Sequence, residues 1–586
     1  MKNFTEIQSL LEKLIPMPAN LPVIYLLGDT GAGKTCFVRQ LLGTTNQSFP
    51  SVRRFRTTVA PTEFVITNES EFKAAFVFKE KKEVEQYVLE ILEQVVEDAV
   101  TANDEREEQD LADLLSESSD QRFRLRCFVD EDTRQQLAKR IHKILAPKIR
   151  SWSNSNFSGE TDLTTVIELA LETEFHAELS EIHAEIMERI LVRVSDVCAG
   201  GTTGHLPETF NFSSNNRNEF VEKLKIFLGL DEGAISPVLE KARVRGNLKS
   251  PLLPQATEIV ITDGEGIGHD AREAKVLSAR HFDYFYASDS IILVEDSETP
   301  FTRGGKSALS AISTSGYLPK LCLAFSRLDK VEQETRELQK REVNQSLRNV
   351  LNALQQDGIE VERDSLTVRY YSKMNEIQPD LESQRELISL VESIIKKHGE
   401  VRARFVAPKY DFELLAAFLA NANATFRKIW AGYIWGEGAE AAKWQTQKAF
   451  TKRMSWRTEE FRFLKPVAEF RQYLVLNLQT FLANPVGWTE EITEAHKKDC
   501  LERLRQEVSN QILSYVRNEI LDEKHPDWNS AAELSGTGTT PIRSRIITRV
   551  IENSAPELTG SRAIEFKDAI KLILHRSIEV CKTHSS

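Results

Sequence analysis

Few cysteines and no long apolar run occur in this sequence, and both absences narrow the class of protein. The six cysteines lie far apart along 586 residues, and no C-x-x-C pair indicates a zinc ribbon or a redox motif. Nowhere do about 18 consecutive apolar residues occur, so no conventional membrane-spanning helix is predicted. Residues 1–20 lack the uninterrupted apolar stretch of a signal peptide and predict a short amphipathic helix. We therefore expect a folded cytoplasmic chain with reduced thiols.

Positive charge is also scarce relative to negative charge. The chain has 75 Lys and Arg against 88 Asp and Glu, and the net charge of -13 disfavours nucleic acid as a partner. An H-E-x-x-H motif, a serine nucleophile elbow and a kinase signature are all missing. Hydrophobic residues nevertheless make up 41% of the chain, which is enough to fill cores, and the length predicts about three or four domains.

The strongest local pattern is a strand, a glycine-rich loop and a helix near the N-terminus. Residues 21–27, LPVIYLL, are apolar and β-prone, which is typical of a strand buried on both faces of a parallel sheet. The loop at 28–35 follows, and helical spacing then continues to a stop at Gly43. The loop reads GDTGAGKT and fits G-x-x-x-x-G-K-[ST] at every position.

Each residue type in this loop suits the binding of phosphate groups. Glycines at 28, 31 and 33 permit a tight backbone whose successive N–H groups point at phosphate oxygens, next to the positive end of the following helix. Lys34 is expected to reach the β- and γ-phosphates, and the Thr35 hydroxyl is expected to bind Mg²⁺. The predicted nucleotide contacts here are Gly28, Asp29, Thr30, Gly31, Ala32, Gly33, Lys34, Thr35 and Cys36.

Further strands are predicted on both sides of a long helical region. They fall at residues 63–67, 74–78, 258–262, 290–295, 320–326 and 366–371. From residue 258 onward the strands alternate with helical stretches, which is the pattern of βαβ units. We predict an N-terminal helix at 1–20, an α/β domain from 21–78 and 256–400, a mainly helical insertion at 79–255 and a C-terminal helical domain at 401–586.

A carboxylate follows one of the predicted strands. Asp263 comes directly after residues 258–262 and opens a D-x-x-G string that ends at Gly266. A carboxylate at the C-terminal edge of a strand, beside the glycine loop, is placed to hold Mg²⁺ through a bound water. Gly266 can then donate its N–H group to the γ-phosphate.

This ordered set of motifs resembles the P-loop GTPases of the translation-factor, Ras and dynamin superclass. The resemblance covers the α/β region only, and the loop is similar to those of large septin-like, dynamin-like and immunity-related GTPases. It implies an α/β P-loop NTPase fold, a G domain, with GTP and Mg²⁺ as cofactors and hydrolysis of GTP to GDP and phosphate. ATP is the alternative nucleotide.

Two later segments approximate the base-reading motifs of that family. Ser326, Arg327 and Asp329 stand where the family has [NT]-K-x-D, so the resemblance implies that Asp329 accepts hydrogen bonds from guanine N1 and N2. Ser372 and Lys373 approximate the family's S-A-K motif. Ser326 and Arg327 depart from the usual Asn or Thr and Lys, so the sequence determines base selectivity less well than phosphate binding.

The family's first switch contains a Thr that binds Mg²⁺ and the γ-phosphate. The resemblance implies that role for Thr57 or Thr58, with Thr58 joining Thr35 and Asp263 as the predicted metal ligands. Arg54 is similar in position to the Arg of G-protein α subunits, which acts in cis on transition-state charge.

The position after D-x-x-G departs from Ras-like proteins, which carry a water-orienting Gln there. This chain has Ile267, and an aliphatic side chain cannot orient water by hydrogen bonding. Nearby polar candidates are Glu265, His269 and Asp270, and the predicted catalytic set comprises Lys34, Arg54, Thr57, Thr58, Glu265 and Gly266. We therefore predict slow intrinsic turnover that self-assembly or a protein partner stimulates. The competing hypothesis is a nucleotide-binding scaffold with little turnover.

The segment at 401–480 is basic and rich in tryptophan in an otherwise acidic chain. It holds thirteen Lys and Arg against seven Asp and Glu, together with Trp430, Trp435, Trp444 and Trp456. Such a segment suits either contact with anionic lipid or an acidic partner, or ordinary packing in a core. Peripheral membrane contact therefore stays an open alternative, while the nucleotide is the partner that the motifs predict.

Overall fold

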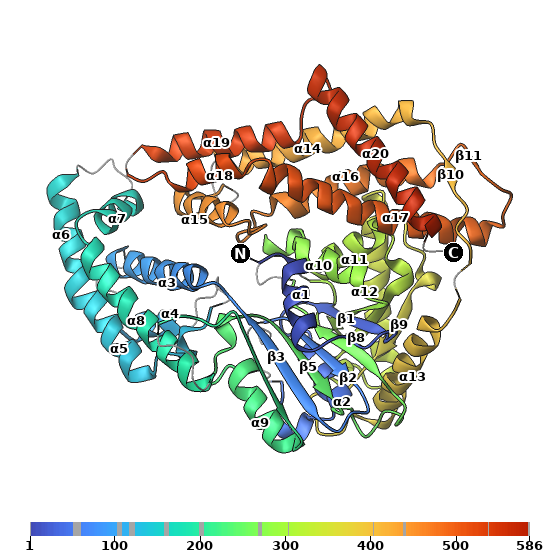
Figure 1. Ribbon diagram of the computed structural model, residues 1–586, viewed down its shortest axis with the longest axis horizontal. Helices are drawn as coiled ribbons and strands as arrows, with labels where there is room; N and C mark the ends of the chain where they lie inside the picture. Colours follow the sequence, from blue (N-terminus) through green and yellow to red (C-terminus); the bar gives the residue numbers. More distant parts are fainter. Residues whose placement is uncertain are drawn as a thin grey trace. The chain divides into compact units, whose positions relative to one another are not determined.

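The computed structural model describes residues 2–50, 60–101, 108–116, 123–157, 163–198, 204–267, 272–302, 304–401, 403–436, 441–536 and 538–583 (Figure 1). The chain divides into two compact units. Unit 1 comprises Met1–Leu21 and Thr35–Glu265, and unit 2 comprises Pro22–Lys34 and Gly266–Ser586. Both units are discontinuous in sequence, because residues 22–34 belong with the C-terminal half.

Unit 1 combines a mixed sheet with a set of helices. Its strands are β2 (Thr62–Ile66), β3 (Phe72–Phe78), β4 (Thr209–Ser214), β5 (Leu239–Gly246) and β6 (Ile259–Asp263). They lie in the order β4-β3-β5-β2-β6, in which β2 is parallel to β5 and antiparallel to β6. β3 runs antiparallel to both β4 and β5.

The helices of unit 1 fall into an N-terminal pair and a long inserted group. The chain starts with α1 (Phe4–Leu14), and α2 (Lys34–Leu42) follows the glycine loop. The inserted helices are α3 (Lys81–Thr101), α4 (Glu108–Ser116), α5 (Glu131–Arg140), α6 (Ala146–Asn156), α7 (Leu163–Glu172), α8 (His176–Val197) and α9 (Arg217–Leu228).

The prediction that residues 79–255 are a mainly helical insertion needs one correction. β4 and β5 lie inside this range and join the sheet, with β5 between β3 and β2. The charged residues of β5 hid it, because Lys241 and Arg243 are buried against Glu63 of β2 at 2.6 and 2.7 Å. Burial by itself would raise the pKa of Glu63, but these two cations lower it to about 2. Residues 241–245, KARVR, alternate polar and apolar side chains, but the polar side chains at 241 and 243 are buried, so the alternation does not mark a solvent-exposed face.

Unit 2 begins with a parallel sheet whose strands lie in the order β1-β7-β8-β9. They are β1 (Val23–Gly28), β7 (Ser290–Asp296), β8 (Leu321–Ser326) and β9 (Thr367–Tyr370). The apolar runs VIYLL and SIILV explain the buried faces, because such runs suit strands covered on both sides. The associated helices are α10 (Ala279–Ala287), α11 (Gly305–Thr314), α12 (Arg336–Gln356) and α13 (Leu381–His398). All six strands predicted after residue 60 are present.

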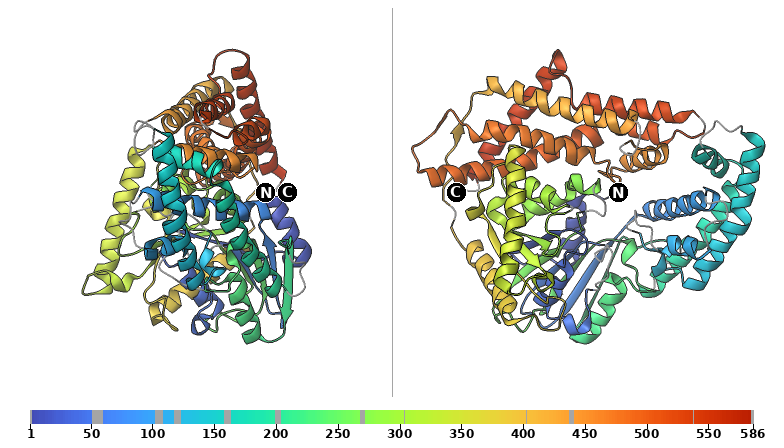
Figure 2. Two further views of the ribbon diagram at one scale, coloured as in Figure 1. Left: turned by 90° about the vertical axis from the view of Figure 1, so that its left-hand side faces the viewer. Right: turned by 180° about the vertical axis from the view of Figure 1, so that it is seen from behind.

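The rest of unit 2 is helical, as the sequence predicts. It contains α14 (Leu415–Trp435), α15 (Trp444–Ser455), α16 (Pro466–Ala483), α17 (Glu494–Arg517), α18 (His525–Ala532), α19 (Thr539–Ser554) and α20 (Ser561–Thr583), with a small pair β10 (Pro408–Lys409) and β11 (Gly487–Trp488). α16 packs against both α14 and α17, and the views of Figure 2 show the three helices side by side. None of the described helices has the length and apolar character needed to cross a bilayer.

Trp430 of the basic segment belongs to the core of this helical region. It is 1% exposed, and its Nε1 donates a hydrogen bond to the buried Glu469 at 2.5 Å. Burial raises the pKa of Glu469 to about 8, against the hydrogen bonds from Trp430 and Tyr433. Trp435 at the end of the same helix is 49% exposed. The tryptophans of this segment therefore do not form one surface.

Candidate functional site

The glycine loop between β1 and α2 has the backbone that its sequence predicts. Gly28, Gly31 and Gly33 have φ values of 148°, 85° and 102°, a region that L side chains rarely adopt. A Cβ atom at Gly28 would clash with the carbonyl oxygen of Val294 on the neighbouring strand β7. Glycine is therefore required at Gly28 both by backbone conformation and by the space available.

Lys34 places its ammonium group on this loop. Its Nζ donates hydrogen bonds to the carbonyl oxygens of Gly28 at 2.7 Å and Asp29 at 3.0 Å. The residue is 7% exposed, and the next one, Thr35, is 6% exposed in the first turn of α2. A buried cation beside glycine N–H groups makes the loop a strongly anion-attracting element.

The segment after β6 packs against the same loop through glycine. A Cβ atom on Gly266 would lie 2.9 Å from Thr30 Oγ1 and 3.6 Å from Lys34 Nζ, so no larger residue fits without displacement. The next residue, Ile267, donates its backbone N–H to the Gly28 oxygen at 3.3 Å and is 2% exposed. The structure thus brings Gly266 to the loop and buries the aliphatic side chain of Ile267.

Two oxygen-bearing side chains have the chemistry of magnesium ligands. Asp263 ends β6 and is 2% exposed, and Thr35 stands near the start of α2. Among the described residues, no cluster of three or more His, Cys, Asp and Glu side chains could hold a metal ion. Mg²⁺ prefers few protein ligands together with water and substrate phosphates, so the residues present fit that ion. Their joint use of one ion stays a prediction.

A buried acid that the sequence analysis missed lies near the loop. Glu295 near the end of β7 is 3% exposed, and its Oε2 accepts the N–H of Phe301 at 2.8 Å. Its Oε1 has no hydrogen-bond partner among the described residues. Burial raises the pKa of Glu295 to about 8 against the Phe301 hydrogen bond, and the negative charge of Asp29 adds to the rise. The sequence signal that could have revealed Glu295 is an acidic residue at the end of an apolar strand.

Asp29 is held by the N-terminus of a helix. Both of its carboxylate oxygens accept the backbone N–H of Gly304 at 3.1 Å, immediately before α11. A Cβ atom on Gly304 would lie 2.6 Å from Asp29 Oδ1, so glycine lets the helix approach this closely. The second residue of the loop is therefore fixed in place by α11.

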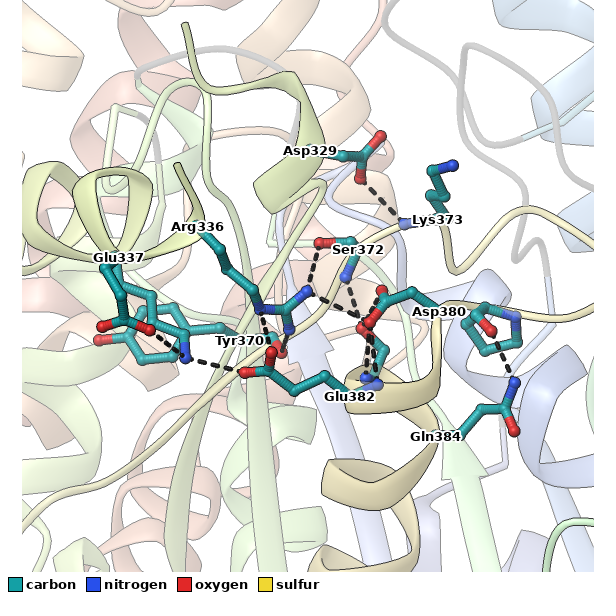
Figure 3. A network of polar contacts seen from close by, with 12 residues as sticks. Asp329, Arg336, Glu337, Tyr370, Ser372, Lys373, Asp380, Glu382 and Gln384 are labelled. Carbon is teal, nitrogen blue, oxygen red and sulfur yellow. Dashed lines mark hydrogen bonds and ion pairs between the residues drawn. The ribbon is translucent and has the colours of Figure 1, made fainter. Parts of the chain in front are cut away.

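The residues predicted to read the base lie at and just after the ends of β8 and β9. Ser326 Oγ donates a hydrogen bond to the Ala32 carbonyl oxygen at 2.6 Å, which ties the end of β8 to the loop. Arg327 pairs with Asp296 at 2.5 Å. Asp329 Oδ1 accepts the backbone N–H of Lys373 at 2.9 Å (Figure 3). The structure thus brings the segments at 326–329 and 372–373 together.

Several predicted site residues lie outside the described residues. They are Arg54, Thr57, Thr58, His269 and Asp270. Glu265 is described and is half-buried at the end of unit 1. The predicted roles of these residues stay predictions.

Comparisons with known proteins find little similarity. No protein-family model and no curated protein matches the sequence. Two solved structures, each described as an oligomerised bacterial dynamin pair that senses and tethers membranes, match 99% of this chain at 11% and 12% identity. They are matched over 73% and 76% of their own lengths, with TM-scores of 0.30 and 0.29. The residues of the site therefore carry the functional argument.

Proposed function

We propose that this chain is a Mg²⁺-dependent P-loop GTPase that hydrolyses GTP to GDP and phosphate. The loop at 28–35 carries the proposal, because its three glycines at positive φ and the Lys34 ammonium form a phosphate cradle between a buried strand and a helix. The approach of Gly266 to Thr30 and Lys34 supports a second contact to the terminal phosphate.

In this proposal, different residues of the site bind the phosphates, hold Mg²⁺ and stabilise the charge of the transition state. Loop N–H groups and Lys34 hold the β- and γ-phosphates, and the Gly266 N–H donates to the γ-phosphate. Thr35 and Asp263 would hold Mg²⁺, Asp263 through a water, and the bound ion neutralises charge that develops on the phosphate oxygens. Arg54, Thr57 and Thr58 keep the roles that the family resemblance implies.

The test of phosphate binding is Lys34→Ala. Removing the ammonium leaves the phosphate charge without its nearest cation, so we expect GTP affinity and turnover to fall by about 100-fold or more. Equilibrium binding of a fluorescent GTP analogue and phosphate release measure the two effects. Lys306→Ala is the matched control, because Lys306 is 42% exposed and pairs only with Asp357 among its described contacts. Equal binding by wild type and Lys34→Ala would exclude a P-loop nucleotide site.

The identity of the base depends on Asp329. If its carboxylate accepts hydrogen bonds from guanine N1 and N2, Asp329→Asn loses that interaction and gains one suited to xanthine. We expect GDP affinity to fall roughly 100-fold, consistent with the loss of charge-assisted hydrogen bonds, while affinity for xanthosine diphosphate rises. Competition binding with GDP, ADP and xanthosine diphosphate measures this. Tight ADP binding that the substitution leaves unchanged would replace GTP by ATP as the substrate.

A nucleotide-binding scaffold with little turnover is the second candidate. The buried aliphatic Ile267 favours it, because this side chain cannot position the attacking water. The GTPase and the scaffold would both bind GTP, and they would differ only in whether they hydrolyse it. Phosphate release that stays at the Lys34→Ala background under every condition, with GTP bound, would favour the scaffold.

A further inference from the structure

We propose that Arg336 is a positioning residue for nucleobase recognition, which it performs by fixing the loop that holds Asp329. The inference rests on the proposed nucleotide site and assigns a function to the polar network that surrounds residues 370–373. Figure 3 shows this network, with Arg336 between Tyr370, Ser372 and Glu382.

Arg336 joins three elements of unit 2. It is the first residue of α12, and its side chain is 22% exposed. One terminal nitrogen donates to Ser372 Oγ at 3.1 Å, and the other donates to the Tyr370 carbonyl oxygen at 3.2 Å. Its Nε lies 3.0 Å from Glu382 of α13. A planar guanidinium can make these contacts at once, because its donors are held in a fixed fork.

The N-terminus of α13 holds the same loop from the other side. The Ser372 backbone N–H donates to Ser383 Oγ at 2.8 Å, and Ser383 Oγ donates to Asp380 Oδ2 at 2.7 Å. Asp380 caps α13 and lies 3.3 Å from Arg336. Burial opposes ionisation of Asp380, but the Ser383 hydrogen bonds and Arg336 lower its pKa. The Arg336 cation therefore faces an ionised carboxylate at neutral pH.

This network reaches Asp329 through one residue. Lys373 follows Ser372, has a φ of 55°, and donates its N–H to Asp329 Oδ1 at 2.9 Å. A side chain that reads a base by hydrogen bonding must be oriented, since such bonds weaken steeply when misaligned. Arg336 and Ser383 fix Ser372, Ser372 fixes Lys373, and Lys373 orients Asp329.

The test separates base recognition from phosphate binding. GDP, inosine diphosphate, ADP and tripolyphosphate compete with a fluorescent GDP analogue for the wild type, Arg336→Gln and Ser383→Ala. The triphosphate chain is held by residues 28–35, so tripolyphosphate affinity should stay within about two-fold. The ratio of GDP to ADP affinity should fall roughly ten-fold in both variants, as expected for the loss of one well-aligned hydrogen bond.

Arg369→Gln is the matched control. Arg369 has a similar exposed fraction, 28%, and pairs with Glu386 of α13 at 3.3 Å, but it lies on β9 before the loop. It should lose the same kind of ion pair and keep the wild-type affinity ratio. Thermal unfolding of each variant establishes that the compared proteins are folded, and Ser383→Ala covers the case in which Arg336→Gln is unfolded.

The outcomes distinguish the inference from the proposed function. A wild type that binds no nucleotide overturns both. A wild type that binds nucleotide but prefers ADP overturns the assignment of guanine and, with it, the role of Asp329 that Arg336 is proposed to support. Unchanged ratios in folded Arg336→Gln and Ser383→Ala, or an equal fall in Arg369→Gln, would overturn the positioning role of Arg336.

Discussion

At the scale of single residues, burial rather than sequence position decides which acids carry charge near the site. Asp29 is half-buried and shares the single Gly304 N–H between its two carboxylate oxygens, whereas Glu295 is enclosed and has one unpartnered oxygen among the described residues. Burial raises the pKa of Glu295 to about 8, so its carboxyl is mostly neutral at pH 7. Keeping this acid neutral limits the negative charge beside a phosphate-binding loop.

Glu295 should make stability fall as pH rises. Between pH 4.5 and about 8 the unfolded chain has released this proton and the folded chain retains it, so the free energy of unfolding drops by up to about 1.4 kcal/mol per pH unit. Glu295→Gln is neutral in both states and lacks this slope. We expect the free energy of unfolding of the variant, relative to that of wild type, to increase by roughly 1 kcal/mol per pH unit between pH 5 and 7. Chemical unfolding at several pH values measures this difference. Glu298→Gln, in the segment directly after β7, is the exposed control, and parallel profiles for Glu295→Gln and wild type would contradict the prediction.

At the scale of elements, one buried and one partly buried arginine join α10 and α11 to the C-terminal helices within unit 2. Arg517 of α17 reaches both oxygens of Asp283 on α10 at 2.8 and 2.6 Å and also pairs with Glu459. Arg471 of α16 is 1% exposed, donates to Ser315 after α11 and stacks on the ring of Phe282 at 3.4 Å. Burial lowers the pKa of Arg471 to about 9. These contacts hold α10 to α17 and the end of α11 to α16.

Breaking the Arg517 contact should be costly. Arg517→Gln leaves Asp283 and Glu459, with side chains 11% and 18% exposed, without their cation, and we expect a loss of about 3 kcal/mol in stability. Arg549→Gln is the control, because its ion pair with Asp527 is 58% and 30% exposed and should contribute less than about 1 kcal/mol. Thermal unfolding of both variants measures the difference. Similar small shifts would show that the Arg517 cluster does not hold α10 to α17.

At the scale of the whole molecule, the proposed GTPase carries an aliphatic residue, Ile267, at the position directly after its D-x-x-G string. Ile267 is buried where a Ras-like protein carries Gln, so chemistry in the isolated chain should be slow. Our hypothesis is that self-assembly or a protein partner completes the site. Slow turnover and assembly are therefore linked hypotheses.

A concentration series tests that link. We expect GTP turnover per molecule to rise about ten-fold or more as the protein is concentrated, equivalent to about 1.4 kcal/mol of barrier. Phosphate release measures the rate, light scattering measures assembly over the same range, and Lys34→Ala sets the background. A high rate at the lowest concentration would contradict slow intrinsic turnover. A slow rate that does not change with concentration would show that self-assembly does not stimulate turnover. Turnover would then need a protein partner, or the chain would be a scaffold.

The sequence by itself determined the local features of this protein. The loop at 28–35, its flanking strand and helix, and the apolar strands β6 to β8 follow from neighbouring residues, because spacing and backbone preference act over a few positions. Only the tertiary structure revealed β5 as a sheet strand, the enclosed Glu295 and the contact between Arg336 and Ser372. Lys241 and Arg243 are buried opposite Glu63, a partner that is far away in sequence. Pairing across such separations depends on which strands become neighbours in the sheet, and the periodicity of residues along the chain does not determine this.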